Sequence, residues 1–386
     1  MRQPHLVRSV FTALCFFMCA GIARAQSVEP VEPFKVGTFE IGGAPVVGMV
    51  LRDELIVDIA AANAALESDR TYSHMQMPEG MLELIEAYED GLKDRLYLIV
   101  NELVEQNRLD GDARPGYVHD VAATKILPPI MYPSKIMNAA VNFYTHACEG
   151  CSEEELAART RERQQNRGVP YLFLKPTRGA IIASGEDIVI PYGRNRTDWE
   201  VELGTVIGRT GKYVSATRAE DYVFGYMVTI DVSDRGGRPP GGVGGVDWFV
   251  GKGHDTFAPQ GPWIVPKEFY GDPMQRLHQQ LLIDGVTVQE ARAGDMIHSL
   301  WELIEYASSL ITIYPGDVLN SGTSGGTSSG AFETGTRSGY LEPGEEIAAT
   351  IEGIGTLRHK VAAEGPPPGD LSGAQLPSVS GVRTDD

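Results

Sequence analysis

Alternating polar and apolar residues mark several short strands along the chain. In "RTDWEVELGTV" (196–206), acidic residues alternate with apolar ones: Asp198, Glu200 and Glu202 with Trp199, Val201 and Leu203. Because successive side chains of a strand point to opposite faces, this segment predicts a strand with an acidic face and an apolar face. Carboxylates this close repel one another unless a positive charge lies between them. The pattern therefore indicates a counter-charge on the acidic face.

Other periodicities predict the fold class. Residues 34–66 alternate and turn like a short β-meander followed by a small helix. Residues 80–105 carry a helical stripe of apolar side chains: Leu82, Ile85, Leu92, Leu96, Ile99 and Leu103. Further along, short strands alternate with Gly/Pro turns, and one helix is expected near 295–310, starting after Asp295. Together these patterns predict an α+β, β-rich protein.

The chain of 386 residues is long enough for two domains. The proline-rich segment "ILPPIMYPSK" (126–135) is expected to begin the second of them. We therefore expect a small N-terminal domain over 34–125 and a larger second domain over 126–362. The remaining residues, 363–386, contain too few apolar side chains to fold and are expected to be a disordered tail.

The first 25 residues have the composition of a secretory signal peptide. They contain three arginines and no acidic residue, and an apolar run leads into the small-residue sequence "ARA" before Gln26. The apolar run is short for a membrane span, which makes an N-terminal anchor the weaker alternative. We expect cleavage between Ala25 and Gln26 and export to the periplasm or the medium.

Charge excludes some partners. Removal of 1–25 takes away three arginines, so the formal net charge changes from −19 to −22. A protein this acidic is poorly suited to bind nucleic acid or an anionic membrane surface. No later segment of the sequence is apolar enough to span a bilayer. Nucleic acid and membrane are therefore not expected partners.

The segment 147–168 is highly charged and offers little to bury. Ser152 is a candidate N-cap, Glu155 occupies the capping-box position and Gly168 is a candidate stop signal. The pattern fits an ordinary solvated helix or a mobile lid that orders over a ligand.

Two cysteines remain after signal cleavage, Cys148 and Cys151. A single C-x-x-C is a weak zinc signal, and no thioredoxin-like context supports a redox role. We interpret the pair as incidental or joined by a local disulfide.

Two further residues bear on the acidic strand. Asp231 follows the apolar run 226–230, where a charge is costly unless it is paired or bound to a metal. Lys252 comes just past an apolar segment expected to be a strand. A cluster of carboxylates suits a hard divalent cation, whereas the ordinary alternative is a solvent-facing edge strand.

Six segments in order resemble the fumarylacetoacetate hydrolase family. They are "SKIMNAAVNFYTHACE" (134–149), "DWEVELGTVIG" (198–208), "DVSDR" (231–235), "FVGKGHDTFAPQGPW" (249–263), "IYPGDVLNSGT" (313–323) and "EGIGTL" (352–357). The resemblance implies that family's mixed β-sandwich or roll, a small N-terminal domain and a homodimer.

The resemblance also implies a site. Glu200, Glu202 and Asp231 would ligate one Mg²⁺ or Mn²⁺, or Ca²⁺ as in some members, and this cation would neutralise the acidic face. The implied catalytic residues are His146, Glu149 and Lys252, and the implied substrate contacts are Arg235 and Thr323. Spacing of i, i+3 lets His146 and Glu149 meet on one helical turn.

The implied activity is hydrolysis of a carbon–carbon bond in an acylpyruvate-type 1,3-dicarbonyl, a 2,4-dioxo acid. Alternatives are a 2-oxo acid decarboxylase or keto–enol isomerase on the same scaffold, or an exported metal- or ligand-binding protein without turnover. The chain departs from the family pattern at Ile230, at Gly236 and over 320–324. For this reason the substrate of no individual member is carried over.

Overall fold

The structure is a computed structural model that describes residues 29–237, 247–328, 339–366 and 369. The expected signal peptide (1–25) and most of the expected tail (363–386) lie outside these residues. Among the described residues, no helix has the length and apolar character needed to cross a membrane. The structure contains one chain, so the homodimer stays a prediction.

An N-terminal lobe contains the expected β-meander and helices. Its elements are β1 (Lys35–Ile41), β2 (Ala44–Leu51), β3 (Leu55–Asp58), α1 (Ile59–Leu66), α2 (Met81–Ala87), α3 (Leu92–Glu105), β4 (Val118–Asp120) and β5 (Lys125–Leu127). The helical stripe expected over 80–105 is present, divided between α2 and α3. Gly91 takes a φ of 100°, a left-handed conformation that ends one helix and starts the next.

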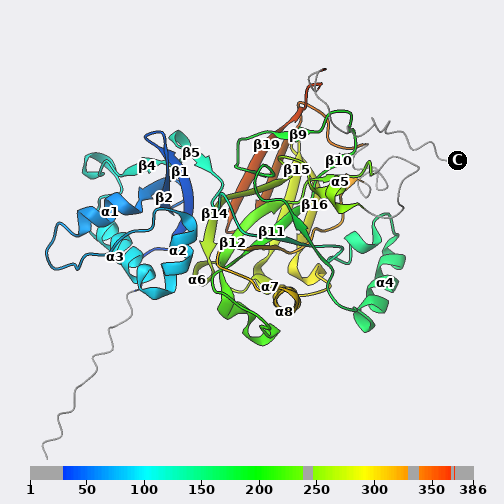
Figure 1. The fold of residues 1–386 in the computed structure, drawn as a ribbon, viewed down its shortest axis with the longest axis horizontal. Helices are drawn as coiled ribbons and strands as arrows, with labels where there is room; N and C mark the ends of the chain where they lie inside the picture. Colours follow the sequence, from blue (N-terminus) through cyan, green and yellow to red (C-terminus); the bar gives the residue numbers. More distant parts are fainter. Residues whose placement is uncertain (1–28, 238–246, 329–338, 367–368, 370–386) are drawn as a thin grey trace, which may run out of the picture.

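The sheet of the lobe continues into the rest of the molecule. Strand β1 pairs with β14 (Ala258–Pro266), which Figure 1 shows at the junction between the lobe and the remaining chain. The path then runs antiparallel through β12 (Val223–Ile230), β11 (Val201–Ile207) and β17 (Val318–Asn320), and on to β6 (Ile136–Ala139) and β7 (Leu172–Lys175). The short β8 (Ile181–Ile182) also joins this sheet, beside β14.

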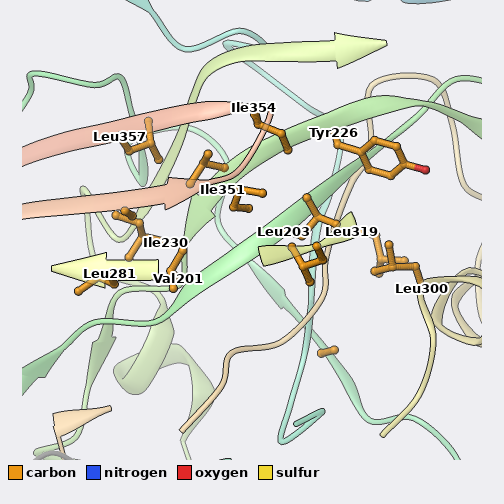
Figure 2. Packing of buried hydrophobic residues seen from close by; sticks show 14 of the residues in the cluster. Val201, Leu203, Tyr226, Ile230, Leu281, Leu300, Leu319, Ile351, Ile354 and Leu357 are labelled. Atoms are coloured by element: carbon orange, nitrogen blue, oxygen red, sulfur yellow. The ribbon is translucent and has the colours of Figure 1, made fainter. Parts of the chain in front are cut away.

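A second sheet packs against the strands β11 and β12. Its order is β16 (Val286–Arg292), β15 (His278–Ile283), β18 (Glu346–Ile351), β19 (Gly355–Ala363) and β9 (Ile188–Ile190). Figure 2 shows Val201 from β11 near Ile230, Leu281 and Ile351 in this core, and all four are at most 1% exposed. The mixed sheets with peripheral helices confirm the expected α+β, β-rich class.

Short elements complete the fold: the two-stranded pair β10 (Thr197–Asp198) and β13 (Ser233–Asp234), and the helices α4 (Glu153–Gln165), α5 (Trp248–Lys252), α6 (Lys267–Tyr270), α7 (Pro273–Arg276) and α8 (Leu300–Leu310). Helix α8 is the helix expected near 295–310, and it begins five residues after Asp295. Ser299 caps it, accepting a hydrogen bond from the backbone of Glu302. Helix α4 has the predicted capping box of Ser152 and Glu155, but it ends at Gln165, before Gly168.

Candidate metal centre and active site

The acidic segment folds largely as its alternation predicts, although not as one strand. Residues 197–198 form β10, and β11 begins at Val201, because Asp198 pairs with Ser233 while Val201 pairs with Ile230 of a different strand. The apolar side chains of the segment enter the core, and the carboxylates occupy the opposite face. That face is buried as well, which excludes a solvent-facing edge strand.

Two of these carboxylates, Glu200 and Glu202, meet Asp231 at the start of β11 and the end of β12. The backbone N–H of Asp231 donates to Glu200 O at 2.9 Å, so the antiparallel pairing brings their side chains together. One oxygen from each of Glu200, Glu202 and Asp231 lies within 4.8 Å of the others, and each residue is at most 3% exposed. This geometry matches the ligand set that the sequence predicts.

Cationic side chains bind two of the three carboxylates. Lys252 Nζ lies 2.7 Å from Glu200 Oε2 and 2.6 Å from Asp231 Oδ2. Burial alone would raise the pKa of Glu200, but the charges of Lys252 and Arg235 outweigh it and hold that pKa well below the ordinary value. Lys252 ends the short helix α5, whose N-cap is Asp247, so the expectation that it follows a strand is wrong.

A second lysine, Lys175, also lies at this site, although none of the sequence motifs indicated it. It ends β7 and its ammonium contacts Asp231 Oδ1 and donates to Val232 O at 2.8 Å. The only local hint is a lysine at the end of the apolar run "YLFLK". Burial lowers the pKa of Lys175 to about 8, although the charge of Asp231 opposes this shift.

Glu202 differs from its two neighbours because no cationic side chain among the described residues binds it. Its Oε2 accepts a hydrogen bond of 2.8 Å from the backbone N–H of Gly322. Burial, together with the charges of Asp231 and Glu200, raises its pKa well above the ordinary value. A buried carboxylate that lacks a counter-ion, beside two other carboxylate oxygens, fits a divalent cation. The triad can therefore hold such an ion.

Asp198 and Arg235 lie at the edge of the triad. Arg235 Nε donates to Asp198 Oδ2 at 2.9 Å, and its Nη2 contacts Glu200 Oε1. Asp198 also accepts hydrogen bonds of 2.8 Å from the backbone N–H groups of Trp199 and Ser328. These contacts occupy the Asp198 carboxylate, so it supports Arg235 and does not belong to the ligand set.

The predicted dyad is formed. His146 opens a one-turn 3₁₀ helix, and its Nδ1 lies 3.2 Å from Glu149 Oε1. Thr327 fixes the carboxylate of Glu149, donating through its backbone N–H at 3.1 Å and its hydroxyl at 2.6 Å. Burial would lower the pKa of His146, but its hydrogen bond to Glu149 and the charge of Glu200 raise it above the ordinary value.

His146 of the dyad, the triad and Lys252 line one cavity of about 60 Å³. Its lining includes every predicted site residue except Glu149, which stands behind His146: His146, Glu200, Glu202, Asp231, Arg235, Lys252 and Thr323. The Thr323 hydroxyl donates to Val201 O at 2.9 Å and accepts from Gln289 Nε2 at 2.8 Å. Thr323 is therefore held by the protein with little hydrogen-bonding capacity left for a ligand.

Two aromatic rings form a wall of the cavity that the motifs did not indicate. Phe173 and Trp248 are stacked, with ring centroids 4.5 Å apart and planes at 22°. Lys252 Nζ lies 5.2 Å from the centroid of Phe173, so this wall stands over the lysine.

Known proteins share this chain's sequence and fold. A family model described as "Fumarylacetoacetate (FAA) hydrolase C-terminal" matches residues 135–362. The chain is 35% identical over 234 residues to 2,4-didehydro-3-deoxy-L-rhamnonate hydrolase of Sphingomonas sp. (strain SKA58), covering 61% of this chain and 75% of that protein. It is 33% identical over 272 residues to the mitochondrial oxaloacetate tautomerase FAHD2A of Bos taurus, covering 67% of this chain and 78% of the relative.

Among solved structures, maleylpyruvate hydrolase from Sphingobium sp. SYK-6, in complex with manganese(II) ion and pyruvate, is similar with a TM-score of 0.61 and 25% identity. The similarity covers 86% of this chain and 100% of that chain. The fold expected from the motifs is therefore confirmed, and the buried triad agrees with the divalent cation found in that relative. Because the family model matches more than half of its residues, the chain belongs to the fumarylacetoacetate (FAA) hydrolase family.

Proposed function

We propose that this protein is a metal-dependent hydrolase that cleaves a carbon–carbon bond in an acylpyruvate-type substrate, a 2,4-dioxo acid. One observation carries the proposal: His146 and the acidic triad line the same cavity. Cleavage of such a bond needs an activated water and a means of stabilising the carbanion that leaves. The dyad supports the first requirement, and the triad with Lys252 supports the second.

The cation would be held by Glu200, Glu202 and Asp231, with Mg²⁺ or Mn²⁺ as the expected ions and Ca²⁺ as a possible substitute. When bound, it supplies Lewis-acid stabilisation of negative charge on the oxygens of a 2-oxo acid. Lys252 adds a fixed positive charge beside the same oxygens, because its ammonium is held by two of the ligand carboxylates.

Neutral His146 would accept a proton from water through Nε2, because Nδ1 faces Glu149. The water oxygen then bonds to the distal carbonyl carbon of the substrate, and the bond from that carbon to the methylene carbon breaks. The electron pair stays with the methylene carbon, which takes up a proton to give pyruvate, and the distal half leaves as a carboxylic acid. Glu149 orients the imidazole and stabilises its protonated form.

The walls of the cavity favour an uncharged distal group. The arginine and lysine that line it, Arg235 and Lys252, are already bound to carboxylates of the protein. Phe173 and Trp248 offer a flat apolar surface instead. The cavity, as the described residues line it, therefore suits an alkyl or aryl acylpyruvate better than a substrate with a second carboxylate.

The test is an assay of residues 26–386 with Mg²⁺ or Mn²⁺ against acylpyruvates of different distal groups, with both products identified by mass spectrometry. Pyruvate and the matching carboxylic acid in equal amounts are the expected products. Tight metal binding without turnover of any 2,4-dioxo acid or 2-oxo acid would instead support a binding protein.

Keto–enol tautomerisation is the second candidate, favoured by the similarity to bovine oxaloacetate tautomerase. Such a reaction needs the cation and Lys252 but no hydrolytic water. His146→Ala separates the two: we expect it to abolish acylpyruvate hydrolysis and to leave part of any oxaloacetate tautomerase activity. A wild-type enzyme that only tautomerises would overturn the hydrolase proposal.

We also propose export of the chain, on the composition of residues 1–25 alone. N-terminal sequencing of protein from the periplasm or medium is expected to start near Gln26. Recovery of the chain in the cytosol with Met1 retained would contradict export.

A further inference from the structure

Glu149, the acid of the dyad, lies inside a covalent loop. Cys148 and Cys151 form a disulfide, and the two residues between them are Glu149 and Gly150. Gly150 has a φ of 76°, a left-handed conformation that lets the chain turn back within the loop. The backbone N–H of Cys151 donates to Cys148 O at 3.1 Å across the same turn. The acid of the dyad is thus carried on a closed loop, and the histidine begins the 3₁₀ turn that enters it.

The same disulfide anchors the start of helix α4. Ser152, the N-cap of α4, follows Cys151 directly. Helix α4 has no buried residue of its own, and Figure 1 shows it at the edge of the molecule opposite the N-terminal lobe. Beyond its other end, Arg167 binds Glu302 and the carbonyl oxygen of Ile297. The disulfide is therefore the link between a weakly packed helix and the dyad.

The triad is held independently of this loop. Its residues come from β11 and β12, which pair with each other and pack in the core. Its partners Lys252 and Lys175 come from α5 and β7. Opening the disulfide would change the backbone that carries Glu149 without touching a ligand of the cation.

We propose that the Cys148–Cys151 disulfide is a positioning bond for the dyad, required for hydrolysis and not for metal binding. This proposal rests on the proposed hydrolase function. A dithiol reductant breaks the S–S bond: it gives two electrons and two protons to Cys148 and Cys151, which become thiols, and is itself oxidised to a disulfide. Cys148 lines a cavity of about 300 Å³ beneath α4, through which a small reductant can reach the bond.

The experiment compares oxidised protein (residues 26–386) with protein reduced by dithiothreitol and desalted anaerobically before Mg²⁺ is added. Thiols are counted by mass after alkylation of a separate sample. A displacement of about 1 Å at a catalytic group can cost about 100-fold in rate, so we expect kcat to fall by roughly 10- to 100-fold. We expect KM and the calorimetric Mg²⁺ affinity to stay nearly unchanged, and reoxidation to restore kcat.

The Cys148→Ser/Cys151→Ser variant is the matched control. It is expected to reproduce the low kcat of the reduced enzyme and to be insensitive to reductant, because residues 26–386 contain no other cysteine. A merely structural bond would lower the melting temperature but would not shift the acid limb of the pH profile, which reports the pairing of His146 with Glu149. Wild-type kcat and pH profile in this variant would overturn the proposal.

Failure of the proposed function gives a different result. If the oxidised protein hydrolyses no 2,4-dioxo acid, the hydrolase proposal fails. The positioning role is then tested by NMR titration of His146 in oxidised and reduced protein. A lower His146 pKa after reduction supports the loop as the element that holds the dyad, and an unchanged pKa overturns it.

Discussion

Lys175 and Asp231 form an ion pair that solvent does not reach, since each side chain is 1% exposed. Lys252 binds the other oxygen of the same carboxylate, so Asp231 has two ammonium partners from different elements. One partner belongs to a family motif of the sequence, and the other was found only in the structure. The two lysines compensate the charge of a ligand that must stay ionised to bind a cation.

Lys175→Met is expected to destabilise the fold without weakening metal binding. Breaking a buried ion pair costs about 3 kcal/mol or more of unfolding free energy, and here Asp231 loses one of its two buried ammonium partners. Loss of a positive charge beside three carboxylates makes the site more attractive to Mg²⁺. Denaturant unfolding and calorimetry measure the two effects. Lys93→Met, which breaks an exposed pair with Glu89, serves as the control and should cost about 1 kcal/mol or less.

If Lys175→Met instead lowers Mg²⁺ affinity by about tenfold, equal to about 1.4 kcal/mol, the charge argument is wrong. Lys175 would then hold Asp231 in the orientation that ligation needs, and that orientation would matter more than the added charge.

Glu202→Gln is expected to have opposite effects with and without metal. The carboxylate of Glu202 is buried against two others, and that burial and repulsion raise its pKa. A neutral amide removes the repulsion, so the variant should melt at a higher temperature than wild type in EDTA. Because an oxygen ligand with full charge is lost, it should gain less from Mg²⁺ than wild type does. Thermal unfolding under both conditions gives the result.

Asp198→Asn is the matched control for Glu202→Gln. Asp198 is an equally buried acid of the same segment, but its oxygens face Arg235 and backbone N–H groups. We expect it to retain the stabilisation by Mg²⁺. Loss of that stabilisation in Asp198→Asn, with retention in Glu202→Gln, would place the cation elsewhere.

The acidic face was predictable because its signal is local, whereas the choice of Glu200, Glu202 and Asp231 as the ligand set came from the family resemblance. Side chains of a strand alternate strictly, so Glu200 and Glu202 had to share a face, and Asp231 stood out as an acid after an apolar run. The contacts that support the site are not local. Lys175 lies 56 residues from Asp231, and Thr327 lies 178 residues from Glu149. No spacing in the sequence relates such pairs, since the sheet order brings them together.

The limits of the helices could not be predicted accurately, for a different reason. Helix α8 was expected near 295–310, starting after Asp295, but it begins later, at the capping box in "SLWE" (299–302). The division at Gly91 follows from one backbone angle that apolar periodicity does not report. Both are turn and cap effects, which override periodicity at helix ends.

The pH dependence of hydrolysis is expected to follow the pKa of His146. A general base must be neutral, so kcat/KM should rise with pH through this pKa, which Glu149 and Glu200 hold above the ordinary 6.5. Glu149→Gln removes one negative charge and stabilises the imidazolium less. The rise should therefore move to lower pH while the plateau falls by about 100-fold. An acid limb that does not move in Glu149→Gln would show that His146 is not the titrating base.

A second histidine is expected to make the fold sensitive to acid. His359 is 3% exposed, and burial lowers its pKa to about 4, although the Glu186 carbonyl opposes this shift. The unfolded chain binds a proton near pH 6.5, so the stability from keeping His359 neutral is lost as pH falls from 6.5 towards 4. The loss is about 3 kcal/mol at most. Unfolding free energies of His359→Asn should fall less than those of wild type over this range.

Helix α4 is expected to act as a lid over the cavity. It has a capping box but no buried residue, so its amides should exchange with solvent quickly in the protein without ligand. Oxalate is a suitable probe because its two oxygens resemble those of a 2-oxo acid. With Mg²⁺ and oxalate together, the amides of 153–165 should become protected, as measured by hydrogen exchange and mass spectrometry.

Helix α8 provides the internal control for this measurement. It buries Leu300, Leu303 and Ile304, so its amides should be protected with and without ligand. Closure of α4 would exclude bulk water from the attacking water beside His146. Arg167→Ala releases the far end of the lid from Glu302. This variant should therefore lower both the protection of the α4 amides and kcat. Equal protection of α4 in both states would mean a permanently docked helix. In that case the dyad is preformed, and exclusion of water cannot depend on α4.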